Sequence, residues 1–500
     1  MKNILEFLEK NAKEYAEKTA FIDTQEQLTW GALCRTAQSI GTALFAEGRR
    51  NRPIAVYFDK SVRTVAAMLG VVYSGNFYVV IDSEMPVERI EKIFATLQPC
   101  AILTDEKHLE NARQLKVEAL YLYEEAAAVP TDAAVLDAVR SVQIDTDPLY
   151  ALYTSGSTGM PKGAVINHRN VIAYSRWTCE TFDITSDTVF GNQTPFYFSM
   201  SVTDIYSTLR SGATLVIIPK QFFAFPIKLV EFLNEYKVNT IYWVPSAMAM
   251  AANFKLFEVA KPEHLTTVLF AGEVMPTKHL NYWIRHLGDK LTYANLFGPT
   301  ETTDICTYYV VDRKFEDDEP LPIGKHCNNC DVFILKENGE PAAPGEEGEL
   351  YARGSFLSAG YYNNPEKTAA AFVQNPLNTA YPEIVYKTGD LVKEAENGDI
   401  LYICRKDYQI KHMGYRIELG EIEAAASAIE NMQECACVYD EKNDKIVLFY
   451  TARKLKEETI FEILATKLTD YLMPNRLEKV NPMPHNQNGK IDRKLLATML

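Results

Sequence analysis

The chain has 500 residues, a formal net charge of −15 at pH 7, 47% apolar residues and 23% charged residues. This length exceeds what one hydrophobic core supports, so we expect at least two domains. The composition is that of a globular protein, and the negative charge argues against a general binder of nucleic acid. Because no apolar run reaches the length of a transmembrane helix, we expect a cytoplasmic protein without membrane insertion.

The first hundred residues alternate between strand and helix patterns after an amphipathic N-terminal helix and a short hairpin. We expect a strand at 54–58, a helix at 62–74, a strand at 77–81, a helix at 87–98 and a strand at 101–104. Such alternation is typical of βαβ units and a mainly parallel sheet. Ligands of parallel sheets bind beyond the carboxyl ends of the strands.

A glycine-rich loop, Thr-Ser-Gly-Ser-Thr-Gly-Met-Pro-Lys-Gly at 154–163, follows the apolar run 150–153. Glycines let backbone N–H groups approach phosphate oxygens, and Lys162 adds a positive charge for the same anion. The loop is not a Walker A motif, because no Gly-Lys-Ser/Thr triplet closes it. On its own it is consistent with either a phosphate site or a surface turn.

A second alternating block follows the loop, with a helix from Asn170 and strands at 214–218, 240–243 and 266–270. From about 331 to 404 the strands are short and separated by turns, which predicts a β-rich subdomain. The last segment, 405–500, has the pattern of a compact α+β domain. The predicted fold class is therefore α/β, with an N-terminal core at 1–404 and a small C-terminal domain.

Five further motifs occur in a fixed order after the loop: Asn-Leu-Phe-Gly-Pro-Thr-Glu (295–301), Gly-Glu-Leu-Tyr-Ala-Arg-Gly (348–354), Tyr-Lys-Thr-Gly-Asp (386–390), Arg-Lys-Asp-Tyr-Gln-Ile-Lys (405–411) with its continuation to 423, and Asn-Gly-Lys-Ile-Asp (488–492). Together with the loop they resemble the adenylate-forming superfamily, which contains acyl-CoA synthetases, luciferases and adenylation domains. The likeness covers nearly the whole chain. The segments 269–274 and 488–494 are most similar to peptide-synthetase adenylation domains and stand-alone D-alanine–carrier-protein ligases.

This resemblance implies an AMP-forming acid–thiol ligase that uses ATP and Mg²⁺. Such an enzyme activates a small carboxylic or amino acid as acyl-AMP and transfers it to the phosphopantetheine thiol of an acidic carrier protein. No carrier motif is present near the C-terminus, so we expect a separate carrier protein. The alternatives are a D-alanine–carrier-protein ligase proper, an acyl- or aryl-CoA ligase and, as a third class, a non-catalytic nucleotide-binding homologue.

The resemblance also implies roles for individual residues. Lys490, Glu301 and Thr158 would be catalytic: Lys490 would bridge the substrate carboxylate and the α-phosphate, and Glu301 would hold Mg²⁺. The residues that would contact ATP are Thr154, Ser155, Gly156, Ser157, Thr158, Gly159, Lys162, Asn295, Leu296, Phe297, Gly298, Pro299, Thr300, Asp390, Tyr402, Arg405 and Lys490.

The C-terminal domain of this superfamily moves between the two half-reactions. The resemblance places the hinge at Asp407 and the tunnel for the thiol at Gly414, where the absence of a Cβ suits a narrow arm. A cluster of basic residues would attract an acidic carrier protein. Its members are Arg405, Lys406, Lys411, His412 and Arg416.

The acyl pocket departs from the family pattern. Its walls would be Phe198, Ser199, Met200, Thr203, Tyr242, Leu269, Ala271, Gly272, Leu296, Asp304, Ile305 and Lys490. Ligases for α-amino acids carry an aspartate at the position of Ser199, and D-alanine ligases carry an apolar residue at that of Asp304 and a cysteine at that of Ala271. Three substrates are compatible: an acid without an α-amine, an acid with a more distant amine paired with Asp304, or a small amino acid bound despite Ser199.

Overall fold

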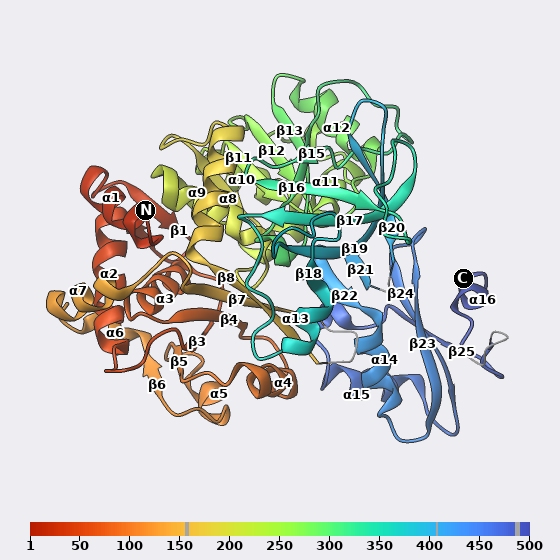
Figure 1. The fold of residues 1–500 in the computed structure, drawn as a ribbon, viewed down its shortest axis with the longest axis horizontal. Coiled ribbons are helices and arrows are strands. Elements are labelled where there is room, and N and C mark those ends of the chain that lie inside the picture. Colours follow the sequence, from red (N-terminus) through yellow and green to blue (C-terminus); the bar gives the residue numbers. More distant parts are fainter. Residues whose placement is uncertain (156–159, 407–408, 486–490) are drawn as a thin grey trace. The chain divides into compact units, whose positions relative to one another are not determined.

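The computed structural model describes residues 1–155, 160–406, 409–485 and 491–500. The chain forms two compact units (Figure 1). Unit 1 comprises Met1–Ser83, Gln98–Leu152 and Ala164–Lys406, and unit 2 comprises Glu84–Leu97, Tyr153–Gly163 and Asp407–Leu500. In the described part of the chain, no helix is both long enough and apolar enough to cross a membrane.

The predicted N-terminal βαβ alternation forms a six-stranded sheet. Its central strands are completely buried apolar runs, as expected for parallel strands covered on both faces. In spatial order the strands are β6 (Leu120–Leu122), β5 (Ala101–Thr104), β3 (Pro53–Phe58), β4 (Phe77–Asp82), β7 (Pro148–Thr154) and β8 (Lys162–Asn167). The helices of this region are α1 (Leu5–Glu14), α2 (Trp30–Leu44), α3 (Val62–Tyr73), α5 (Leu109–Gln114), α6 (Tyr123–Ala128) and α7 (Ala133–Val142).

The second alternating block forms a nine-stranded sheet in unit 1, in which β11, β12 and β13 run parallel side by side (Figure 1). Its spatial order is β15 (Lys325–His326), β14 (Thr307–Val310), β13 (Thr292–Phe297), β12 (Thr267–Phe270), β11 (Thr240–Trp243), β9 (Val189–Asn192), β10 (Thr214–Ile217), β1 (Thr19–Ile22) and β2 (Gln27–Thr29). Its helices are α8 (His168–Thr181), α9 (Met200–Ser211), α10 (Pro226–Glu235), α11 (Pro245–Asn253) and α12 (Thr277–Leu287), with short 3₁₀ turns η1 (Lys220–Ala224), η2 (Leu256–Glu258) and η3 (Thr300–Thr302).

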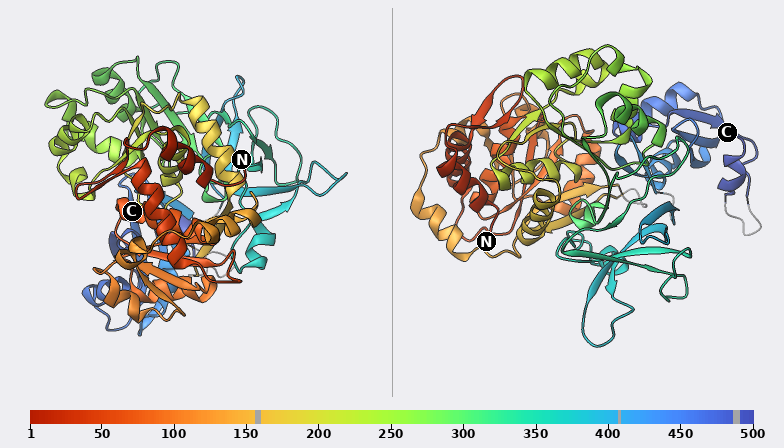
Figure 2. Two further views of the ribbon diagram at one scale, coloured as in Figure 1. Left: turned by 90° about the vertical axis from the view of Figure 1, so that its left-hand side faces the viewer. Right: turned by 90° about the horizontal axis from the view of Figure 1, so that it is seen from above.

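The predicted β-rich segment of unit 1 is present as a third sheet, which Figure 2 shows in teal to light blue. All of its strand pairs are antiparallel. Its strands are β16 (Cys330–Leu335), β17 (Glu347–Gly354), β19 (Ile384–Glu394), β18 (Phe372–Gln374) and β20 (Ile400–Arg405), and its helix is α13 (Pro365–Ala371).

Unit 2 contains the predicted α+β segment. A two-stranded hairpin, β21 (Gln409–His412) with β22 (Tyr415–Glu418), precedes a three-stranded sheet of β23 (Met432–Asp440), β24 (Lys445–Ala452) and β25 (Arg476–Lys479). The helices are α4 (Val87–Leu97), α14 (Leu419–Ser427), α15 (Glu457–Ala465) and α16 (Arg493–Ala497), with the 3₁₀ turn η4 (Asp470–Leu472). Helix α4 joins this unit through a buried ion pair between Arg89 and Glu421. The boundary at residue 405 stays a prediction.

Candidate active site

A cluster of hydroxyl groups surrounds the carboxylate of Asp304 in the interior of unit 1. Asp304 Oδ2 accepts hydrogen bonds from Thr203 Oγ1 at 2.8 Å, Tyr174 Oη at 3.0 Å and Tyr242 Oη at 3.1 Å. The Ser199 hydroxyl also hydrogen-bonds to this carboxylate. Because Thr203 and Tyr174 themselves lie 2.6 Å apart, oxygen to oxygen, the group is one connected network, which we call the hydroxyl cluster.

The environment of Asp304 perturbs its ionisation. The side chain is 1% exposed, and its burial raises the pKa to about 6, although the hydrogen bonds from the hydroxyl cluster oppose that rise. At neutral pH the carboxyl group is therefore mainly ionised. A charged group in so dry a place needs either a counter-charge or dense hydrogen bonding, and here the hydrogen bonds are present.

The elements that carry the hydroxyl cluster explain its geometry. Tyr242 lies on β11, where it pairs in register with Leu269 of β12, near the carboxyl ends of parallel strands. Thr203 lies in the first turn of α9, and Tyr174 is on the buried face of α8, which packs against α9. The cluster thus assembles residues from one sheet edge and two adjacent helices, at the end of the sheet where such folds bind ligands.

The predicted acyl-pocket residues differ in exposure. Phe198, Ser199 and Gly272 are half-buried, and the other pocket residues that the structure describes are buried. The buried ones are Met200, Thr203, Tyr242, Leu269, Ala271, Leu296, Asp304 and Ile305. Lys490 lies outside the described residues. The structure thus brings four predicted pocket residues into one hydrogen-bonded group, namely Ser199, Thr203, Tyr242 and Asp304. The sequence did not predict the fifth member, Tyr174, because a tyrosine within a helical pattern is no distinctive signal.

The segment that leads into Asp304 folds back tightly on β13. A Cβ added to Gly298 would lie 2.3 Å from the Asp304 carbonyl oxygen and 2.5 Å from the Ile305 Cα. Cys306 donates a backbone hydrogen bond of 2.8 Å to the Phe297 carbonyl, which closes the loop. The glycine of the Asn-Leu-Phe-Gly-Pro-Thr-Glu motif therefore holds a predicted nucleotide segment directly against a predicted acyl-pocket segment.

A buried lysine, Lys60, supports the segment before the pocket, and the sequence pattern did not single it out. Lys60 Nζ donates hydrogen bonds to the carbonyls of Gln193 at 2.9 Å and of Asn192 and Thr194 at 3.4 Å. Asn192 Nδ2 donates in turn to Asp204 Oδ2 at 2.7 Å. Burial lowers the pKa of Lys60 to about 7 and raises that of Asp204 to about 8, and the attraction between the two charges opposes both shifts.

Glu301, the predicted ligand of Mg²⁺, is completely buried in η3. Its Oε1 accepts a hydrogen bond of 2.5 Å from Tyr361 Oη, and its backbone carbonyl accepts one of 2.9 Å from Ser358 N. Among the described residues, no three His, Cys, Asp or Glu side chains are grouped to hold a metal ion. Because Mg²⁺ is usually bound by one or two carboxylates together with substrate phosphates, a single oriented carboxylate suits this ion.

Asp390 and Arg405 face each other across the β19–β20 pair, in register. Arg405 Nη1 lies 3.1 Å from Asp390 Oδ1 and donates a hydrogen bond of 2.7 Å to the Thr388 carbonyl. Asp390 Oδ1 is buried and engaged in this ion pair, although no well-aligned hydrogen bond reaches it from the residues that the structure describes. The ring of Tyr402 on β20 lies 5.8 Å from that of Phe297, which is at the end of β13 in the nine-stranded sheet.

Two residues at the start of the glycine-rich loop can be placed, both in unit 2. Thr154 Oγ1 is buried without a hydrogen-bond partner among the described residues. Ser155 Oγ donates to the Arg416 carbonyl at 2.6 Å and accepts from Glu418 N at 3.1 Å, so β22 already uses this hydroxyl. Four predicted phosphate ligands lie outside the described residues, namely Gly156, Ser157, Thr158 and Gly159, as does the predicted hinge Asp407.

Gly414 occupies a two-residue turn between β21 and β22 in unit 2. His412 and Tyr415 pair across the hairpin, and both intervening residues have positive φ, +52° for Met413 and +81° for Gly414. This is the backbone of a type I′ turn, which favours glycine at its second central position. The turn itself thus explains the glycine, and a role in a thiol tunnel stays a prediction.

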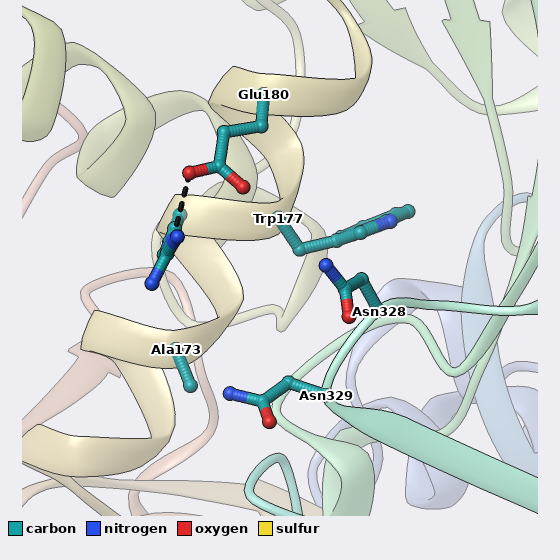
Figure 3. Close-up of a pocket in the computed structure, with 6 residues that line it drawn as sticks. Ala173, Trp177, Glu180, Asn328 and Asn329 are labelled. Atoms are coloured by element: carbon teal, nitrogen blue, oxygen red, sulfur yellow. Dashed lines mark hydrogen bonds and ion pairs between the residues drawn. The ribbon is translucent and has the colours of Figure 1, made fainter.

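A separate pocket beside α8 is not part of this site (Figure 3). It is lined by Ala173, Arg176, Trp177, Glu180, Asn328 and Asn329. An ion pair of 2.7 Å between Arg176 and Glu180 crosses its rim. At about 150 Å³ it is smaller than usual small-molecule sites, and it includes none of the predicted site residues.

Comparisons with known proteins identify the family of the chain. The model of the family described as AMP-binding enzyme matches residues 8–362. An L-proline–[L-prolyl-carrier protein] ligase of Pseudomonas fluorescens is 33% identical to the chain over 99% of both sequences. Bacitracin synthase 1 of Bacillus licheniformis is 32% identical over 99% of the chain, which spans only 9% of that synthase.

Solved structures share the fold. The Vibrio cholerae adenylation domain AlmE, solved with glycyl-adenosine-5′-phosphate, matches with a TM-score of 0.85 at 22% sequence identity, over 99% of this chain and 97% of that one. IdnL1 matches with a TM-score of 0.82 at 24% identity, over 97% of this chain and 99% of that one. At these identities the likeness establishes the fold.

Proposed function

Because the chain belongs to the family of AMP-binding enzymes, we propose that it is an AMP-forming ligase that activates a small carboxylic or amino acid with ATP and transfers it to a carrier protein. The observation that carries this proposal is the arrangement of the motif 295–301. Its glycine packs the predicted nucleotide segment against the backbone at Asp304 and Ile305, so the α-phosphate and the acid would meet at one place.

The chemistry requires two anions, a carboxylate and a triphosphate, to approach each other while charge builds on phosphate oxygens. Positioning and neutralisation of charge therefore dominate catalysis. The carboxylate of Asp390, which lies beside Arg405, would accept a hydrogen bond from a ribose hydroxyl. Arg405 would lie beside the ribose or a phosphate, and Glu301 would hold Mg²⁺, which neutralises phosphate charge when it is bound.

The second half-reaction needs a thiol that reaches the acyl-adenylate. We propose the phosphopantetheine arm of a separate acidic carrier protein; the relative that the chain matches over 99% of both lengths is itself a ligase for a carrier protein. In unit 2, the imidazole of His412 is already engaged, since His412 Nδ1 lies 2.8 Å from Asp444 Oδ1. Lys411 and Arg416 would supply positive charge for this contact.

The test is ATP–pyrophosphate exchange over a panel of small amino, hydroxy and aryl acids, followed by loading assays with free CoA and with carrier protein. We expect exchange with at least one acid and loading of the carrier protein. Lys490→Ala should lower adenylate formation by orders of magnitude while nucleotide binding persists, because this lysine would act on the reacting groups. Exchange with no acid, or CoA as the better acceptor, would overturn the corresponding half of the proposal.

A further inference from the structure

The negative charge of Asp304 has no cationic partner within the described residues. Every polar contact of its side chain is a hydroxyl of the hydroxyl cluster, and no Lys, Arg or His of the described chain forms an ion pair with it. Lys60, the buried cation of this region, is instead hydrogen-bonded to backbone carbonyls beside Asp204. Hydroxyl groups can stabilise a carboxylate, but they cannot neutralise it.

The position of this charge is informative. Asp304 is hydrogen-bonded to Ser199, a residue of the predicted acyl pocket at the N-cap of α9. Ser199 is half-buried while Asp304 is buried, so the carboxylate lies just behind the more accessible serine. The buried charge is therefore next to the place where the acid is predicted to bind.

We propose that Asp304 is the receptor for an ammonium group of the substrate, so that the acid activated is a small amino acid. This inference rests on the proposed function. A hydroxy, keto or aryl acid has no cationic group to offer and would leave the charge of Asp304 without a counter-charge. An ammonium would pair with Asp304 while the hydroxyl cluster fixes the carboxylate in place.

The remaining pocket residues limit the choice further. Leu269, Leu296 and Ile305 are apolar and almost completely buried, so a second charge on the substrate would find no partner among them. The substrate class is therefore a short-chain amino acid with an uncharged side chain. Its amine can be α or β to the carboxyl group, and the assay distinguishes these two.

The experiment measures kcat/KM for ATP–pyrophosphate exchange with matched pairs of acids. The pairs are alanine of each hand against lactate, and β-alanine against 3-hydroxypropionate. The chain is tested as wild type, as Asp304→Asn and as the double variant Ser199→Asp/Asp304→Asn. The readout is the ratio of kcat/KM for the amino acid to that for its hydroxy analogue, because misfolding lowers both members of a pair equally.

We expect the wild type to favour the amino acid of one pair. Asp304→Asn should lower that ratio by about 10- to 100-fold, the usual effect of losing a hydrogen bond to a charged group. The double variant should restore part of the ratio by returning the charge to position 199. A wild type that prefers the hydroxy acids, or an unchanged ratio in Asp304→Asn, would overturn the inference and leave the proposed function intact. Exchange with no acid at all would instead overturn the proposed function, and the inference would fall with it.

Discussion

The hydroxyl of Tyr174 meets the carboxylate of Asp304 across 130 positions of sequence, at 3.0 Å from Oη to Oδ2. Tyr174 comes from the middle of α8, and Asp304 from the loop between η3 and β14. The ring of Tyr174 is itself held in place by Phe356, at 5.3 Å between centroids. A buried carboxylate is thus stabilised by a tyrosine that the sequence motifs do not include.

The pH dependence of amino-acid activation should report on Asp304. Its pKa of about 6 means that protonation below this pH removes the charge that would pair with an ammonium. We therefore expect kcat/KM for the preferred amino acid to fall tenfold per pH unit as the pH drops below about 6. The profile is measured by pyrophosphate exchange from pH 5 to 9. Because Asp204, with a pKa of about 8, also titrates in this region, Asp304→Asn is the control. The acidic limb must be absent in that variant if Asp304 is its cause.

Removal of one donor from the hydroxyl cluster should move this acidic limb. Tyr174→Phe deletes a hydrogen bond that favours ionised Asp304, so we expect its pKa to rise and the limb to shift upward by roughly half to one pH unit. Tyr78→Phe is a matched control, because the Tyr78 hydroxyl contacts Tyr206 and not Asp304. An equal shift in both variants would show that general loosening of the core, rather than the lost donor, is responsible.

The same raised pKa should affect folding. The folded pKa of Asp304 lies above the value of 3.8 for an unperturbed aspartate, so its favourable contribution is complete below pH 3.8 and is lost as the pH rises through about 6. We therefore expect the unfolding midpoint of Asp304→Asn minus that of the wild type to increase from pH 5 to pH 7. Differential scanning calorimetry at both pH values measures this, and a constant difference would contradict the shifted pKa.

Lys60 should be essential to the packing of the segment before the pocket. In Lys60→Met three buried carbonyl groups lose their donor, so we expect a loss of about 1–3 kcal/mol in the free energy of unfolding. Urea denaturation measures the loss. Lys107→Met is the control, because Lys107 forms an exposed ion pair with Asp59 and should cost less than about 1 kcal/mol. Similar losses in the two variants would refute this role of Lys60.

The close approach at Gly298 can be tested by adding one methyl group. Gly298→Ala would place a Cβ 2.3 Å from the Asp304 carbonyl oxygen, so the loop must move and exchange activity should fall by at least tenfold. Gly339→Ala is the control: its surroundings are open, but its φ of +83° gives the strain expected of any alanine in that region. If Gly298→Ala retains activity as Gly339→Ala does, the contact does not position the pocket.

The nucleotide site can be separated from the acid site by Asp390→Asn. This change keeps the shape of the side chain but removes the charge opposite Arg405, so we expect KM for ATP to rise by about 10- to 100-fold. KM for the amino acid should stay within about threefold, because Asp390 is remote from the hydroxyl cluster in the contacts that the structure describes. An equal rise in both constants would indicate a damaged fold, which circular dichroism would reveal.

Much of the fold follows from the sequence pattern alone. The alternation of apolar runs predicts the parallel sheets because strands covered on both faces must be continuously apolar, as β3 and β5 are. The six ordered motifs predict the family, which the match over residues 8–362 confirms. Small peripheral elements such as α5 and β6 are not predicted, because their short sequences carry no clear period.

The sequence by itself placed this chain in the family of AMP-binding enzymes and predicted that it uses ATP and a carboxylic acid, because motif residues act through local backbone geometry that neighbouring residues encode. It also showed that the carboxylate expected at position 199 is missing. Only the tertiary structure decided where the compensating charge lies. Asp304 reaches Ser199 through the packing of α8, α9 and β11 around the loop after η3, and contacts between such distant segments leave no periodic signal in the chain. Burial, which sets the pKa of Asp304, is likewise a property of the packed interior.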